Sequence, residues 1–237
     1  MKIFCIYTNP FPGNRSLKKA QRCIESGKKL NLEINLCESV FFKNNISEMQ
    51  DLGIFSKYKG MPGGNTDFKN KTAPETRIAN GITHYKLYKW SVDNNEAVCI
   101  LEHDAIIIDK FPEPIYDGII QISSHHKDQF TPHTLAHCGR ANKMKIYDPI
   151  GYKDINISWK NTKGIIPHPL KATNGTSGYI VGPKAASEMI EYIQREGVAF
   201  ADRVRQEHFK TCKIYLQIPQ SVLCLSDITS SVELRGI

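Results

Sequence analysis

A continuous apolar run near the middle of the chain limits most strongly what this sequence can fold into. Residues 97–101 (AVCIL) carry no polar side chain, and Glu102, His103 and Asp104 follow directly. A five-residue run bounded by charges is typical of a strand that is buried on both faces. Such strands lie in sheets that helices cover on both sides, so the run predicts an α/β fold.

The first forty residues support this fold class. We expect a strand at 2–8 (KIFCIYT), a basic helix at 16–29 and a second strand at 32–36 (LEINL). A strand, a helix and a strand within this length form a βαβ unit, whose strands are parallel. The 237 residues suit one large α/β domain or a domain with a small lobe. We predict a single domain, 1–237, with a mostly parallel sheet flanked by helices.

Apolar spacing places further elements along the chain. Residues 43–76 are polar and rich in Gly, Asn and Lys, which predicts a loop, and residues 123–170 are expected to form loops with short strands. We expect helices at 78–93, 185–194 and 200–209, and strands at 118–122, 177–181 and 214–218, the last strand of the chain.

Charge and cysteine usage restrict the partners and the compartment. The net charge of +7 favours anionic partners, namely nucleotide phosphates, nucleic acid or a phosphorylated glycolipid, with simple solubility as the alternative. Seven irregularly spaced cysteines without a CxxC pair argue against structural zinc and suit a reducing cytoplasm. No signal peptide or membrane-spanning apolar stretch is visible, so we expect a soluble cytoplasmic protein, at most peripheral to a membrane.

The carboxylates behind the apolar run give the first indication of chemistry. Glu102 and Asp104 follow the carboxyl end of a central strand, where ligands bind in open α/β sheets. Two such carboxylates can share one Mg²⁺ or Mn²⁺ ion with a substrate diphosphate, which the cation would stabilise as a leaving group. His103 is a candidate third ligand. The alternative is an ordinary polar turn after a strand.

Residues 80–108 resemble glycosyltransferase family 25, which is usually found in lipooligosaccharide synthesis and includes collagen galactosyltransferase relatives. The family pattern is a Gly, a Ser-His pair on a helix, and an apolar strand that runs into Leu-Glu-Asp-Asp-Ala. Gly81 matches the glycine, Thr83-His84 stand for Ser-His, and residues 101–105 stand for the acidic motif. Here His103 replaces the central Asp of that motif.

Later segments extend the resemblance to about residue 205. Residues 116–120 (YDGII) resemble a Trp-Asp step before a strand, and residues 175–181 (GTSGYIV) resemble Gly-Thr-x-x-Tyr followed by an apolar pair. Asp202 resembles a family aspartate. The N-terminal Asn-x-x-x-Arg motif is only loosely matched, by Asn9 and Arg15.

The resemblance implies a GT-A-like, Rossmann-type fold and a nucleotide-diphosphate sugar, expected to be a UDP-sugar, as donor. Residues 1–110 would bind this donor and residues 111–237 the acceptor. Family members invert the anomeric carbon, which requires a general base. Asp202 is the first candidate for this base, with a helix N-terminal charge as its alternative role, and Asp227 is a weaker one.

Several more residues are expected around this centre. Each also has a plain structural alternative, such as a core histidine for His84, a surface cation for Arg15 or a tight turn for Gly175. Catalysis is assigned to Asp202 and Asp104, and the acceptor side to Lys171 and Arg140. The expected donor-binding residues are Thr8, Asn9, Arg15, His84, Glu102, Gly175 and Thr176, and the expected metal ligands are Asp104, Glu102 and His103.

The acceptor stays open between two classes. One is a lipooligosaccharide or another glycan, and the other is double-stranded DNA that carries hydroxymethylated bases such as 5-hydroxymethylcytosine. The positive charge and the cationic, aromatic stretches at 57–59 and 137–147 suit DNA phosphates, although they also suit anionic lipid headgroups. A rival hypothesis is a non-catalytic nucleic-acid-binding protein on a degenerate transferase fold. A nucleotidyltransferase ranks low, since residues 9–13 (NPFPG) are not its Gly-rich loop.

Overall fold

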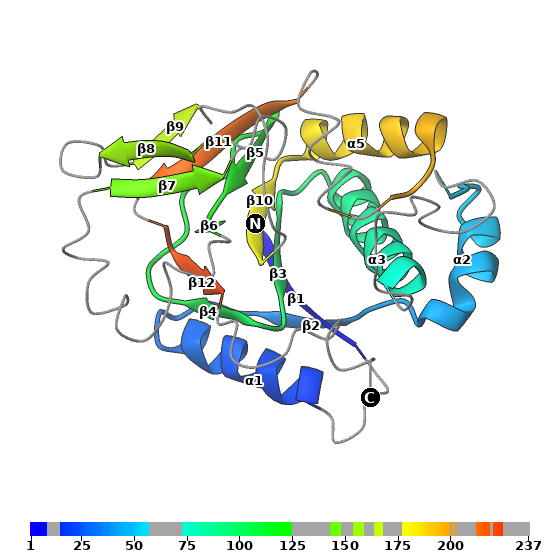
Figure 1. Cartoon of the computed structure of the whole chain (residues 1–237), viewed down its shortest axis with the longest axis horizontal. Coiled ribbons are helices and arrows are strands. Elements are labelled where there is room, and N and C mark those ends of the chain that lie inside the picture. The colour runs from blue at the N-terminus through cyan, green and yellow to red at the C-terminus, as the bar shows by residue number, and fades with distance from the viewer. Residues whose placement is uncertain are drawn as a thin grey trace.

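The centre of the molecule is a seven-stranded sheet, shown in the computed structural model of Figure 1. From one edge to the other its strands are β2 (Asn35–Glu38), β1 (Lys2–Tyr7), β3 (Val98–Glu102), β10 (Gly178–Val181), β5 (Gly118–Gln121), β11 (Lys213–Ile218) and β9 (Gly164–Pro167). The structure describes residues 1–8, 15–56, 73–124, 143–147, 154–158, 164–167, 177–199, 201, 212–218 and 220–224.

The sheet is mostly parallel, as expected, but two of its strands run the other way. β1 pairs in parallel with both β2 and β3, and β11 pairs in parallel with β5. β10 lies antiparallel between β3 and β5, and β9 is antiparallel to β11 at the edge. The result is a Rossmann-like α/β domain with a mixed sheet. An apolar run reads the same in either direction, so the sequence predicted β10 as a strand without its direction.

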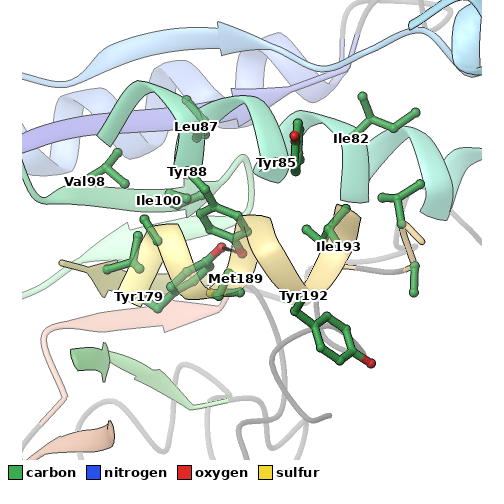
Figure 2. Close-up of a cluster of buried hydrophobic side chains, with 14 of the residues drawn as sticks. Ile82, Tyr85, Leu87, Tyr88, Val98, Ile100, Tyr179, Met189, Tyr192 and Ile193 are labelled. Atoms are coloured by element: carbon green, nitrogen blue, oxygen red, sulfur yellow. Dashed lines mark hydrogen bonds between the residues drawn. The ribbon is translucent and has the colours of Figure 1, made fainter. Parts of the chain in front are cut away.

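Helices and a small second sheet cover the two faces (Figure 1). One face packs against α3 (Ala73–Asn94) and α5 (Pro183–Glu196), and the core between them is drawn in Figure 2. The other face packs against α1 (Arg15–Lys28). The small sheet has the order β4-β12-β6, with bounds Ala105–Ile107, Val222–Cys224 and Ser123–Ser124.

β3 is buried on both faces, which confirms the expectation from its apolar run. Val98 and Ile100 belong to the core under α3, whereas Cys99 and Leu101 belong to the core under α1. All four side chains are fully buried. Because strand side chains alternate between faces, a strand covered on both sides has no position for a charge before its end.

Four expectations about local structure need correction. The stretch 43–76 is not only a loop, because it contains the end of a short 3₁₀ helix, η2 (Phe42–Asn44), and α2 (Asn45–Asp51). α3 begins at Ala73 rather than at 78, and β12 follows β11 as a later strand. The second strand also lies a few residues later than expected. Of the helix predicted at 200–209, Ala201 is helical and the other residues lie outside the described part.

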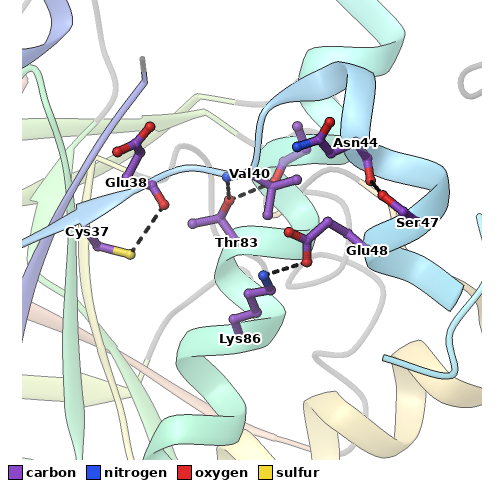
Figure 3. Close-up of polar contacts among 9 residues, drawn as sticks. Cys37, Glu38, Val40, Asn44, Ser47, Glu48, Thr83 and Lys86 are labelled. Carbon is purple, nitrogen blue, oxygen red and sulfur yellow. Dashed lines mark hydrogen bonds and ion pairs between the residues drawn. The ribbon is translucent and has the colours of Figure 1, made fainter. Parts of the chain in front are cut away.

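Tertiary contacts explain α2, which has no apolar stripe. The side-chain amide of Asn45 donates a hydrogen bond of 2.7 Å to the carbonyl oxygen of Glu75 in α3. Lys86 of α3 forms an ion pair with Glu48 of α2 (Figure 3). Polar contacts with α3, together with Met49 packed against the core, therefore hold a short helix that hydrophobic spacing does not reveal. The remaining described strands, β7 (Lys143–Tyr147) and β8 (Asp154–Ser158), form an antiparallel pair.

Gly81 allows an unusually close approach between α3 and the segment after α5. A Cβ at this position would fall directly on the carbonyl oxygen of Ala199. Ala199 and Ala201 are both buried. The glycine of the family pattern thus has a packing role, since it lets the chain that leads to residue 202 lie against α3.

We expect Gly81→Ala to lower the free energy of unfolding by about 1–3 kcal/mol, because the new methyl group overlaps a backbone atom. Gly27→Ala in α1 is the matched control. Its Cβ would meet the end of the Ile34 side chain, which can rotate away, and alanine favours a helix by up to about 1 kcal/mol over glycine. Urea denaturation of both variants measures the difference. Equal midpoints for Gly81→Ala and wild type would contradict the close approach.

Candidate functional site

Polar residues gather at one edge of the sheet, where the parallel strands β1, β2 and β3 end. Thr8 follows β1, Glu38 ends β2 and Glu102 ends β3. The antiparallel β10 begins at the same edge, and the carbonyl oxygen of Ser177 accepts the N–H of Glu102 at 3.2 Å. We call the side of the sheet that these strand ends form the carboxyl edge, as distinct from the outer strands β2 and β9. It is the edge at which ligands bind in open α/β sheets.

The ends of β1 and β2 are tied together by hydrogen bonds. The Tyr7 hydroxyl donates to the Glu38 carboxylate at 3.1 Å, and the Ser39 N–H donates to the Tyr7 carbonyl oxygen at 2.7 Å. Burial and this bond to Glu38 raise the pKa of Tyr7 above its usual value. The Ser39 hydroxyl donates to the Thr8 hydroxyl at 3.1 Å. Thr8 is therefore held against the end of β2.

Thr8 also contacts the start of α1. Its backbone N–H donates to the hydroxyl of Ser16 at 2.8 Å, and Ser16 is buried. Arg15, the first residue of α1, is exposed. The first turn of α1 has no acidic residue, so no carboxylate there opposes the partial positive charge of the helix N-terminus. Two of the expected donor residues, Thr8 and Arg15, thus lie at the beginning of one helix.

At the end of β3 two carboxylates, Glu102 and Asp104, stand on either side of His103. Glu102 is half-buried and accepts a hydrogen bond of 3.3 Å from the side-chain amide of Asn80 in α3. The chain then turns at His103 and Asp104 and enters β4. The pKa of the nearby Cys5 thiol is raised, chiefly by a Cys23 hydrogen bond and by burial, and the negative charge of Asp104 adds to this shift.

The spacing of these side chains bears on the expected metal ligands. Within the ranges that the structure describes, no three His, Cys, Asp or Glu side chains gather closely enough to hold a metal ion. Glu102, His103 and Asp104 are not gathered into such a group, and their assignment as metal ligands stays a prediction. A turn separates side chains that a continued strand would point to the same face.

His84 lies in the core. It has no exposed surface, and its Nδ1 is 2.6 Å from the hydroxyl of Tyr179 in β10, on which its ring stacks. The Tyr179 hydroxyl is also 2.6 Å from that of Tyr88 (Figure 2). Of the two roles expected for His84, this geometry favours the structural one, since the ring links α3 to β10.

A second buried polar group lies where β5 ends. The side-chain amide of Gln121 donates to the carbonyl oxygen of Ser123 at 2.7 Å and to its hydroxyl at 3.1 Å. That hydroxyl donates to the carbonyl oxygen of Gly178 at 3.0 Å. These bonds fix the start of β10, and so the segment that follows Thr176, against β5.

Asp117 belongs to residues 116–120, which resemble the Trp-Asp step of the family. It lies at the amino ends of β5 and β11, on the side of the sheet opposite the carboxyl edge. It precedes the first residue of β5 and forms an ion pair of 2.6 Å with Lys213, the first residue of β11. The hydrogen bond from Lys213 holds the pKa of Asp117 below its usual value. Its position away from the carboxyl edge indicates a role in joining two strands.

Half of the expected site residues lie outside the described part of the chain. They are Asn9, Arg140, Lys171, Gly175, Thr176 and Asp202, together with the weaker candidate Asp227. Three of them directly adjoin described residues. Asn9 follows Thr8, Thr176 precedes Ser177, and Asp202 follows the buried Ala201.

Two residues with contacts at the carboxyl edge, Asn80 and Thr83, carried no site prediction of their own. Asn80 contacts Glu102, and the Thr83 hydroxyl accepts the backbone N–H of Val40 at 2.9 Å, just after β2. Thr83 was named only as the residue that matches the serine of the family's Ser-His pair. The spacing of Asn80 and Thr83 could have indicated both, because residues three apart on a helix share one face.

Two further observations concern the cysteines and the membrane. Five cysteines whose side chains the structure describes form no disulfide: Cys5, Cys23, Cys99 and Cys212 are buried, and Cys37 is half-buried. Among the described helices, none combines the length and the apolar character that crossing a membrane requires.

Comparison with known proteins identifies the family. Residues 19–203, well over half of the chain, match the family described as glycosyltransferase family 25 (LPS biosynthesis protein). A search of curated proteins gave no match. The matched range contains the strand β3, the turn that bears Asp104, and residues 80–108, where the resemblance begins. Since the family consists of enzymes that take sugar from a nucleotide-sugar donor, the chain is a glycosyltransferase and belongs to glycosyltransferase family 25.

Proposed function

We propose that this enzyme transfers a sugar from a nucleotide-diphosphate sugar to a hydroxyl group of a glycan, with the donor bound at the carboxyl edge. The observation that carries the proposal is the end of β3, in the middle of the sheet, where Glu102 is the last strand residue and Asp104 lies in the turn that follows. Thr8 and the start of α1 follow the neighbouring strand β1. Carboxylates from one strand and a helix N-terminus from the next suit a diphosphate with its counter-ion.

The carboxylates fit a divalent cation that is shared with the substrate. Mg²⁺ and Mn²⁺ prefer oxygen ligands, and Mg²⁺ is commonly bound by one or two carboxylates together with substrate phosphates. Asp104, assisted by Glu102, would hold such an ion, and a third protein ligand is not required. When bound, the cation would neutralise the charge that develops on the leaving diphosphate.

The helix α1 supports the phosphate side of this proposal. Free N–H groups and the helix dipole favour an anion at a helix N-terminus. Thr8, Asn9 and Arg15 surround this point in the sequence, and a UDP-sugar is the donor we expect there. Residues 1–110 then supply most of the donor side. Gly175 and Thr176 are assigned to it as well, because they directly precede Ser177, whose carbonyl oxygen accepts the Glu102 N–H.

Asp202 is our candidate for the general base of an inverting transfer. An inverting enzyme needs one group that removes the acceptor proton as the hydroxyl attacks the anomeric carbon. The chain before Asp202 packs on Gly81, and the neighbouring Asn80 contacts Glu102. This packing of residues 199 and 201 supports a base near the carboxyl edge. Residues 111–237, with Lys171 and Arg140, would form the acceptor side.

A panel of donors and acceptors tests the reaction directly. Incubation of the enzyme with UDP-, GDP- and CMP-sugars, Mn²⁺ and purified lipooligosaccharide should release a nucleotide and add one sugar mass to the glycan. A parallel arm uses duplex DNA with 5-hydroxymethylcytosine, digested to nucleosides for mass analysis, because the net charge is +7. Transfer to DNA alone would overturn the glycan acceptor, and no nucleotide release with any donor would overturn the transferase itself.

Asp104→Ala should lower kcat/KM by about 100-fold or more, which is the usual cost of removing a group that stabilises transition-state charge. The matched control is Asp109→Ala, since Asp109 is an exposed aspartate five residues later whose side chain bonds to the next backbone N–H. Initial rates at several Mn²⁺ concentrations measure both variants. Wild-type rates for Asp104→Ala across this range would exclude Asp104 from the donor site.

Asp202→Asn should reduce kcat by about 10²–10⁴-fold, the usual contribution of a general base, and should change the donor KM little. Asparagine keeps the size of the side chain but accepts no proton at neutral pH. Steady-state kinetics separate the two parameters. A raised donor KM with an unchanged kcat would assign Asp202 to binding instead.

A further inference from the structure

One turn of α3 contacts three separate segments of the carboxyl edge. Asn80 donates to Glu102 at the end of β3, Thr83 accepts from Val40 after β2, and His84 contacts Tyr179 in β10. These three residues lie on the side of α3 that faces the sheet. Segments that are far apart in the sequence are therefore held by side chains from a single helical turn.

Thr83 makes two hydrogen bonds in a buried position. Its hydroxyl donates to the carbonyl oxygen of Ala79 at 2.8 Å and accepts the N–H of Val40 at 2.9 Å (Figure 3). The side chain is buried. A hydroxyl has a single proton. Because that proton goes to the helix itself, the oxygen is oriented to receive a donor from outside the helix, which is the backbone of Val40.

This contact reaches the donor side of the site through neighbouring bonds. Val40 follows Ser39, and the Ser39 hydroxyl donates to Thr8 at 3.1 Å. The Ser39 N–H also bonds to the Tyr7 carbonyl oxygen at 2.7 Å. Thr83 thus fixes the segment on which the Thr8 side chain rests. Asn80, three residues before Thr83 on the same helical face, holds the Glu102 carboxylate.

We propose that Thr83 and Asn80 are positioning residues for the donor site. Thr83 acts through Val40 and Ser39 on the end of β1, and Asn80 acts through Glu102 on the end of β3. Together they hold the two strand ends at the separation that the donor diphosphate requires. This role rests on the proposed function of the carboxyl edge. Neither residue needs to touch the substrate. Mutation of a residue that orients the ligands of a bound metal typically lowers metal affinity or activity by about 10–100-fold.

Thr83→Val is the first test, because valine has nearly the same shape and no hydroxyl. The variant leaves the Val40 N–H without its acceptor, and we expect the donor KM to rise about tenfold or more, with a smaller change in kcat. The Kd of UDP with Mn²⁺, measured by calorimetry, should rise in parallel without any turnover. Thr83→Ser retains the hydroxyl and should restore both values to within about twofold.

The matched control is Ser91→Ala at the other end of the same helix. Ser91 is fully buried, and its hydroxyl donates to the Glu96 carbonyl oxygen at 2.6 Å, near the amino end of β3. We expect Ser91→Ala to lower the Tm as much as Thr83→Val while leaving the donor KM and the UDP affinity unchanged. Equal donor KM values for the two variants would overturn the positioning role.

Asn80→Leu examines the second residue. Without the amide, the Glu102 carboxylate loses a partner that orients it, so we expect the Mn²⁺ concentration for half-maximal activity to rise about tenfold. An unchanged Mn²⁺ dependence would overturn the role of Asn80. If the wild-type enzyme itself releases no nucleotide and binds no UDP, the proposed function fails and this inference fails with it. An active wild type with normal Thr83→Val and Asn80→Leu variants overturns the inference alone.

Discussion

The burial of β3 on both faces is the constraint on which the rest of the structure depends. Its side chains from Val98 to Leu101 alternate between two cores and are fully buried, so a charge within this strand would lose its hydration without a partner. The first charged residues therefore stand at its end, in the middle of the sheet. There Glu102 pairs with Ile6 of β1, and Thr8, which follows β1, contacts the start of α1.

α3 links these strand ends to one another through the hydrogen bonds of Asn80, Thr83 and His84. It contributes Ile78, Ile82, Tyr85 and Tyr88 to the core shared with α5, which fixes the helix on the sheet (Figure 2). The polar residues of the same helix then bond to segments that come from distant parts of the sequence. Hydrophobic packing sets the position of the helix, and the hydrogen bonds of its buried polar side chains set the strand ends relative to it.

Sequence patterns predicted most strands and helices because burial determines the apolar spacing on which those predictions rest. They did not predict the antiparallel direction of β10, since its apolar run is compatible with either direction. α2 has an exposed isoleucine, Ile46, and depends on contacts with α3 that no local pattern contains. The site was predicted at the end of β3, whereas Asn80 and Thr83 were missed as individual site residues because polar residues on a helix are usually at the surface.

The central claim is that the donor diphosphate binds at the turn after β3, opposite the start of α1. A crystal structure of the enzyme with UDP and Mn²⁺ tests it most directly. The account predicts electron density for the diphosphate and the ion beside Asp104, with a phosphate oxygen near the Thr8 side chain or the first turn of α1. A nucleotide bound at another edge of the sheet, with Asp104 away from both ligand and ion, would contradict it.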